Sequence, residues 1–309
     1  MIHKSYLVTG GADFIGSALA RKLVDLGHSV IIIDNLSTGF RKNISERATF
    51  IEGDCSDKKV IAKLENAQFD AIFHIAGQSS GEISFENPIY DLNANTLSTL
   101  LLLKYAKEYH CKKFIYASTM SVYGDQPDSP VKESAKNNPL SFYAIGKIAS
   151  ENYMKLFVDF GMTNTALRLF NTYGPGQNME NLNQGMVSIF LEQAFSSKRI
   201  IIKGDKNRFR DYVFIDDVVD AFIKAEAFDD DKYRVINIGT GIRTTVNELL
   251  GKMISMLPYE ITVKFVESTL GDIHGIYADV SLANSSLDWV YTHNIDEGLK
   301  LMLNWRKGK

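Results

Sequence analysis

The sequence has few cysteines and no long apolar run. Cys55 and Cys111 are its only cysteines in 309 residues and form no C-x-x-C pair, which excludes a disulfide framework and a cysteine-based metal site. The richest apolar run, residues 97–106, is interrupted by polar residues and falls short of the roughly 20 apolar residues that a bilayer-spanning helix needs. We therefore expect a cytoplasmic protein without a membrane partner.

Net charge is also nearly absent. Lys and Arg number 34 against 37 Asp and Glu, giving a formal net charge of −3, so the chain lacks the basic footprint of a nucleic-acid-binding protein. The six histidines show no metal-binding spacing, and we expect no metal. An apolar fraction of 45% with 23% charged residues is typical of a globular chain.

Strand-like and helix-like patterns alternate through the first half of the chain. This alternation predicts an α/β fold with a Rossmann-type doubly wound parallel sheet and helices on both faces. Residues 30–33 are apolar at both odd and even positions, which is typical of a strand buried on both faces. The other strands are expected at residues 6–8, 49–51, 71–74, 114–117 and 166–169, and the clearest helices at 15–26, 91–109 and 143–160.

The pattern becomes less regular after residue 171. Glycine, proline and asparagine between residues 174 and 183 predict a long loop, and such loops are usually functional or mobile. We expect a nucleotide-type sheet domain of residues 1–170, to which 211–240 return, and a smaller α/β C-terminal domain of 171–210 and 241–309.

A glycine-containing turn links the first predicted strand to the first predicted helix. Residues 9–16 read T-G-G-A-D-F-I-G, and glycines at this place let backbone and helix N–H groups approach a pyrophosphate. Asp34 closes the second strand, near the spacing of a carboxylate that accepts from both ribose hydroxyls and repels a 2′-phosphate. The pattern favours NAD over NADP.

Two Tyr-x-x-x-Lys pairs occur in the chain. Tyr109 and Lys113 run from a helix end into the next strand, whereas Tyr143 and Lys147 open a predicted helix and share one face of it. The second pair also follows Ser118-Thr119 at the carboxyl end of a strand, where ligand sites of α/β proteins gather. We therefore prefer the second pair.

The charge of Lys147 could activate Tyr143 as a base. Lowering a tyrosine pKa by about 3 units requires about 4 kcal/mol of differential stabilisation. An ammonium about 4 Å away supplies approximately that at an effective dielectric constant of about 20. We expect Lys147 to lower the pKa of Tyr143.

These motifs resemble the extended short-chain dehydrogenase/reductase family of NAD-dependent nucleotide-sugar epimerases and dehydratases, of the UDP-glucose 4-epimerase type. The resemblance covers nearly the whole chain and implies NAD as cofactor, a nucleotide-diphosphate sugar as substrate, and a homodimer formed through helices 91–109 and 143–160. It implies Thr119, Tyr143 and Lys147 as catalytic residues. Implied cofactor-binding residues are Gly10, Asp13, Phe14, Ile15, Gly16, Asp34, Asn35, Ser37, Thr38, Gly39, Asp54, Cys55, Ile75, Ala76, Gly77, Gln78, Asn95, Ser118, Tyr143, Lys147 and Phe170, and implied substrate-binding residues are Ser79, Thr119, Asn171, Arg210 and Asp272.

Two positions depart from the family pattern. Asp13 replaces the second glycine of the T-G-x-x-G-x-x-G fingerprint, and Thr269 replaces the arginine of an R-x-G-D element that touches the diphosphate. A carboxylate about 5 Å from a phosphate costs about 3 kcal/mol at an effective dielectric constant of about 20, more than the roughly 0.3–1 kcal/mol an anion gains at a helix N-terminus. Asp13 either faces the phosphates and weakens NAD binding, or turns outward or caps the helix.

The residues after Thr119 bear on the reaction. Dehydratases of the family have Asp-Glu there and decarboxylating relatives keep a glutamate, whereas this chain has Met120-Ser121. Methionine cannot donate a proton, so the resemblance implies epimerisation at C4 through a transient 4-keto sugar. The alternatives are a nucleotide keto-sugar reductase or dehydratase, and a non-catalytic NAD- or nucleotide-binding sensor, which Asp13 and Thr269 favour and the intact catalytic residues oppose.

Overall fold

The computed structural model describes residues 2–181, 185–268 and 271–308. Its centre is a seven-stranded sheet in the order β3-β2-β1-β4-β5-β6-β11, with all neighbours parallel. The predicted α/β class and parallel sheet are therefore confirmed. The strands are β1 (Ser5–Thr9), β2 (Ser29–Asp34), β3 (Thr49–Glu52), β4 (Ala71–His74), β5 (Lys113–Thr119), β6 (Thr163–Leu169) and β11 (Tyr233–Ile238).

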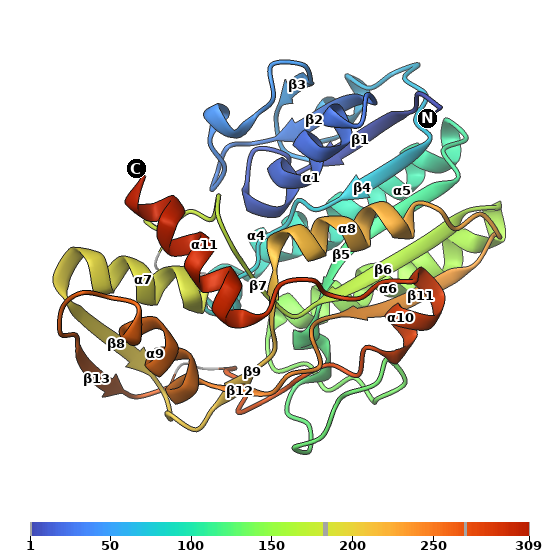
Figure 1. Ribbon diagram of the computed structural model, residues 1–309. Coiled ribbons are helices and arrows are strands. Elements are labelled where there is room, and N and C mark those ends of the chain that lie inside the picture. The colour runs from blue at the N-terminus through green and yellow to red at the C-terminus, as the bar shows by residue number, and fades with distance from the viewer. Residues whose placement is uncertain (1, 182–184, 269–270, 309) are drawn as a thin grey trace.

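Helices cover both faces of this sheet (Figure 1). On one face lie α1 (Phe14–Asp25) and α8 (Ile215–Ala225), and on the other lie α2 (Lys58–Ala62), α5 (Ser98–Glu108) and α6 (Phe142–Phe157). Because successive side chains of a strand point to opposite faces, Ile32 joins the apolar cluster of α1 and α8, whereas Ile33 joins that of α5 and α6. The second strand is thus buried on both faces, as predicted.

The helix predicted at residues 91–109 starts earlier and is irregular. The Asn87 side chain accepts from the Tyr90 N–H at 3.1 Å and caps α4 (Pro88–Leu92), and Pro88 stands in the first turn, where its missing N–H costs nothing. A π-helical turn, η2 (Asn93–Leu97), then joins α4 to α5. The helix predicted at 143–160 is α6, followed by the 3₁₀ turn η4 (Val158–Phe160).

The chain after β6 adds three small sheets beside the large one. In these, β7 (Asn171–Tyr173) pairs with β10 (Tyr212–Phe214), β9 (Phe209–Arg210) with β12 (Thr244–Thr245), and β8 (Arg199–Lys203) with β13 (Thr262–Val266). The remaining helices are α3 (Gly81–Glu86), α7 (Met186–Ser197), α9 (Val246–Ser255), α10 (Ser281–Leu287) and α11 (Ile295–Lys307), and the short 3₁₀ turns are η1 (Arg41–Asn43) and η3 (Met120–Tyr123).

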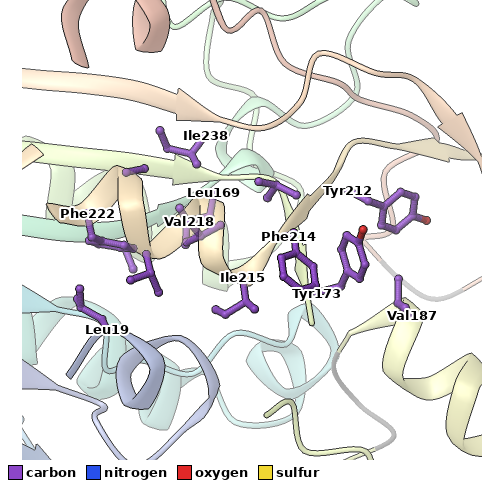
Figure 2. Close-up of a cluster of buried hydrophobic side chains, with 14 of the residues drawn as sticks. Leu19, Leu169, Tyr173, Val187, Tyr212, Phe214, Ile215, Val218, Phe222 and Ile238 are labelled. Carbon is purple, nitrogen blue, oxygen red and sulfur yellow. The ribbon is translucent and has the colours of Figure 1, made fainter. Parts of the chain in front are cut away.

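One apolar cluster continues from the large sheet into these later segments (Figure 2). Leu19 of α1 and Phe222 of α8 belong to it, as does Val187 of α7. Tyr173 and Phe214 lie between them, with ring centroids 5.6 Å apart in an edge-to-face arrangement. The predicted division of the chain into two domains remains a prediction, because this core contains residues of both proposed domains.

The strand order reverses at β1, which has β2 on one side and β4 on the other. In doubly wound sheets such a switch point leaves a crevice at the carboxyl ends of the strands, and ligands bind there.

None of the helices that the structure describes is long and apolar enough to cross a bilayer.

Candidate active site

A cavity of about 360 Å³ lies at the carboxyl ends of β1, β4 and β5. The segments that follow these three strands supply much of its wall, which places the cavity at the switch point of the sheet. The predicted residues that line it are Gly10, Asp13, Phe14, Ile15, Gly16, Asp34, Asn35, Ser37, Thr38, Asp54, Cys55, Ile75, Ala76, Gly77, Gln78, Ser79, Ser118, Thr119, Tyr143, Lys147, Phe170 and Asn171.

Two glycines shape the turn between β1 and α1. Gly10 has φ +70°, a conformation that a side chain disfavours, and a Cβ there would lie 2.8 Å from the Ala76 nitrogen. A Cβ on Gly16 would lie 2.1 Å from the Gly10 oxygen. The turn can therefore close tightly, which leaves the N-terminus of α1 facing the cavity as a pyrophosphate-binding turn requires.

Asp13 occupies the position of the missing glycine without backbone strain. Its φ of −96° and ψ of −177° are extended, so the turn does not need glycine there. Its Oδ1 accepts from the Phe14 N–H at 2.7 Å, and its Oδ2 accepts from the Thr38 hydroxyl at 2.6 Å. Asp13 therefore caps α1, and it also lines the cavity.

Asp34 ends β2 at the edge of the same cavity. Its carboxylate accepts from the Ala12 N–H at 2.9 Å and from the Leu36 N–H at 2.8 Å, which fixes both oxygens. Burial raises the pKa of Asp34, the two backbone donors lower it, and the charge of Asp13 raises it further. A fixed acidic group at the end of the second strand is what binding of a ribose diol requires.

Thr119, Tyr143 and Lys147 meet at the cavity. Thr119 ends β5, and the other two lie one turn apart on α6, whose N-cap Ser141 accepts from the Ala144 N–H at 3.2 Å. Tyr143 is 9% exposed and Lys147 is 4% exposed. The Lys147 ammonium donates to the Ala117 carbonyl at 2.9 Å and lies 5.8 Å from the centre of the Tyr143 ring.

Burial dominates the protonation of this pair. It raises the pKa of Tyr143 to about 12, although a hydrogen bond with Thr119 acts in the opposite direction. It lowers the pKa of Lys147 to about 8, although the carboxylates of Asp91 and Glu151 act against it. The expectation of a lowered Tyr143 pKa is therefore wrong for this structure, because desolvation of the buried phenol dominates.

A buried ionic network supports the part of the cavity wall that carries Ser118 and Lys147. The Ser118 hydroxyl donates to Glu151 at 2.5 Å, and Glu151 pairs with Arg168 at 2.7 Å. All three side chains are buried. Because Glu151 lies one helical turn beyond Lys147, this network ties the lysine-bearing helix to β5 and β6.

Four predicted site residues do not line the cavity. Gly39 packs on the turn, where a Cβ would lie 2.7 Å from the Ala12 carbonyl carbon, and Asn95 is buried beneath Gln78, to whose carbonyl it donates at 2.9 Å. Arg210 donates to Asp272 at 2.9 Å and to the Ile273 carbonyl at 2.6 Å. The two predicted substrate residues Arg210 and Asp272 therefore bind each other, which gives the buried guanidinium of Arg210 a charged partner. Thr269 lies outside the described residues.

The cavity wall also contains residues that sequence reasoning did not assign. Tyr90 comes from α4, Gln177 from the chain between β7 and α7, and Met186 and Val187 from the start of α7. The signal for the last three was the glycine- and asparagine-rich segment after residue 171, which the structure brings to the cavity, whereas no local pattern indicated Tyr90. Asn183, part of that predicted loop, lies outside the described residues.

Comparisons with known proteins agree with this architecture. The model of the NAD dependent epimerase/dehydratase family matches residues 6–239. A putative UDP-glucose 4-epimerase of Methanocaldococcus jannaschii is 36% identical over 97% of this chain and 98% of that relative. The crystal structure of a Thermotoga maritima UDP-glucose 4-epimerase with UDP-glucose has a TM-score of 0.94 and 35% identity, covering 98% of this chain and 99% of that one.

A third relative was solved with the cofactor. The Thermus thermophilus UDP-glucose 4-epimerase complex with NAD has a TM-score of 0.92 and 29% identity, covering 98% of this chain and 99% of that one. The glycine turn and the fixed carboxylate of Asp34 fit the same dinucleotide in this chain. The protein belongs to the NAD dependent epimerase/dehydratase family, and its cofactor is NAD.

Proposed function

We propose that the protein epimerises C4 of a UDP-hexose through a transient 4-keto sugar. The observation that carries this proposal is the meeting of Thr119, Tyr143 and Lys147 at one cavity. The similar M. jannaschii and T. maritima proteins are named UDP-glucose 4-epimerases, the former putatively, and the latter was solved with UDP-glucose. We extend that nucleotide and that reaction to this chain.

Tyr143 is the proposed acid–base residue. NAD, when bound, supplies a reversible hydride acceptor and a cationic ring. The Tyr143 oxygen takes the C4 hydroxyl proton during oxidation and returns it during reduction, with Thr119 orienting the same hydroxyl. Lys147 contributes a positive charge that favours the phenolate. Because the rotated keto sugar takes the hydride back on the opposite face of C4, and the proton is also returned, the configuration at C4 inverts with no net redox change.

The residues after Thr119 favour epimerisation over the family's other reactions. Met120 and Ser121 line the cavity, and neither side chain can act as a carboxylic acid or carboxylate base. A keto-sugar reductase would use the same three residues, and only products distinguish it from an epimerase.

The test is incubation of the full chain with NAD and single UDP-sugars, with products followed by NMR. We expect UDP-glucose and UDP-galactose, or their acetylated or uronic analogues, to interconvert without accumulation of NADH. Consumption of NADH with a keto-sugar would establish a reductase instead. No turnover of any sugar, with NAD binding intact, would support the sensor.

We also propose that the protein is a homodimer joined through α6 and α4, which pack side by side; α4 overlaps only the start of the helix predicted at 91–109. The support is the number of large apolar side chains on these helices that are exposed in the described chain. They are Ile89, Leu92, Phe142, Ile145 and Leu156. Exposed apolar side chains on two packed helices are typical of a protein–protein contact, and a second copy would bury the same face on both partners.

A further inference from the structure

Asp13 is part of the site, but the proposed reaction does not use it. Its carboxylate accepts from the Phe14 N–H at 2.7 Å and from the Thr38 hydroxyl at 2.6 Å. Phe14 is the first residue of α1, and the free N–H groups of a helix N-terminus are the donors that bind a pyrophosphate. One of these donors is therefore already occupied by the protein's own anion.

The cavity holds little positive charge to offset this carboxylate. Among the described residues that line it, Lys147 is the only lysine or arginine, against the carboxylates of Asp13, Asp34 and Asp54. The Lys147 ammonium is bound to the Ala117 carbonyl, and the charge of Asp13 raises the pKa of Asp34. An anionic pyrophosphate thus meets a wall whose net charge is negative.

We propose that Asp13 is an internal anion that competes with the cofactor phosphate for the N-terminus of α1, and that it makes NAD an exchangeable ligand of this protein. Since the Asp13 backbone is extended and unstrained, rotation of its side chain alone releases both the Phe14 N–H and the Thr38 hydroxyl. This inference concerns retention of the cofactor and holds whichever sugar carbon reacts.

Calorimetry on the full chain tests the competition with two ligands. We expect Asp13→Gly to bind NAD at least tenfold more tightly than the wild type. Asp13→Asn should give a smaller gain, because its amide oxygen still accepts from the Phe14 N–H while the negative charge is gone. Adenosine, which has no phosphate, should bind all three proteins equally.

The matched control is another helix-capping carboxylate. Asp57 caps α2 by accepting from the Lys59 N–H at 2.8 Å and does not line the cavity, so Asp57→Asn should leave the affinity for NAD unchanged. Freshly purified wild-type protein should carry less NAD, measured after acid release, than Asp13→Gly. Should Asp13→Gly fold poorly, the Asn variant retains a cap and gives the same comparison.

Several results would overturn the proposal. The first is an equal affinity for NAD in the wild type and both variants. The second is a gain in adenosine affinity as large as the gain in NAD affinity, and the third is a wild-type protein that keeps one NAD per chain through dialysis. Absence of NAD binding in every variant would also overturn it. Loss of sugar turnover with this affinity pattern intact would instead contradict the proposed epimerase activity.

Discussion

The ammonium nitrogen of Lys147 lies 2.9 Å from the carbonyl oxygen of Ala117, inside a wall that lowers its pKa to about 8. The Lys147 charge is therefore lost as pH rises through about 8, and with it the positive charge that favours the Tyr143 phenolate. We predict that kcat falls on the alkaline side near this pH. An alkaline limb near the ordinary lysine pKa of about 10.4 would contradict this.

Asp91 should set the position of that limb. Its Oδ1 accepts from Gln78 at 2.7 Å and from Asn95 at 3.0 Å, and its charge raises the pKa of Lys147. We predict that Asp91→Asn lowers the Lys147 pKa and moves the alkaline limb of kcat to lower pH.

The control for this experiment is Asp217→Asn. Asp217 is a buried carboxylate that accepts from the Thr292 N–H at 2.9 Å and does not line the cavity. Its substitution should lower stability, measured by thermal unfolding, and leave the pH profile in place. An identical shift in both variants would mean that the effect is structural.

Tyr143→Phe should remove most of the turnover. General acid–base groups contribute about 10²–10⁴-fold, so we predict a fall in kcat of that order, measured with the sugar that the wild type converts. Tyr109→Phe is the matched variant, since Tyr109 begins the other Tyr-x-x-x-Lys pair, stacks on Tyr105 and does not line the cavity. An equal loss in both variants would remove Tyr143 from the proposed role.

A charge on the apolar face of α6 should break the dimer. Leu156 is 63% exposed, and we predict that Leu156→Glu yields monomers in sedimentation velocity, because burying an unpaired carboxylate in an apolar contact is unfavourable. Leu301→Glu is the control, as Leu301 is 44% exposed on α11. A wild-type monomer, or a dimer that survives Leu156→Glu, would refute this interface.

The sequence indicated those parts of the site that follow directly from strand ends. Gly10, Asp34 and Thr119 each stand at or just after a strand terminus, and parallel strands bring their carboxyl ends to one edge. The positions of these residues were therefore predictable from the order of elements alone. The helical spacing of Tyr143 and Lys147 was equally sufficient to place both on one face of α6.

Side-chain partners were not predictable in the same way. The pairing of Arg210 with Asp272 joins residues 62 positions apart, and it depends on how a late segment packs against β9. Burial likewise raises the Tyr143 pKa, which was expected to be lowered. That burial depends on segments distant in the sequence, so no local pattern around Tyr143 could predict it. Of the possibilities left open for Asp13, the structure shows the helix cap, and the same residue also lines the cavity.

The parallel pairing of β6 with β11 has a consequence for how the chain forms during synthesis. Thr165 of β6 pairs with Arg234 of β11. This side of β6 is therefore paired only after the intervening segment and β11 have left the ribosome. Until then β6 presents unpaired backbone groups, which invite association between nascent chains. A fragment ending before β11 would carry the same open edge and should aggregate.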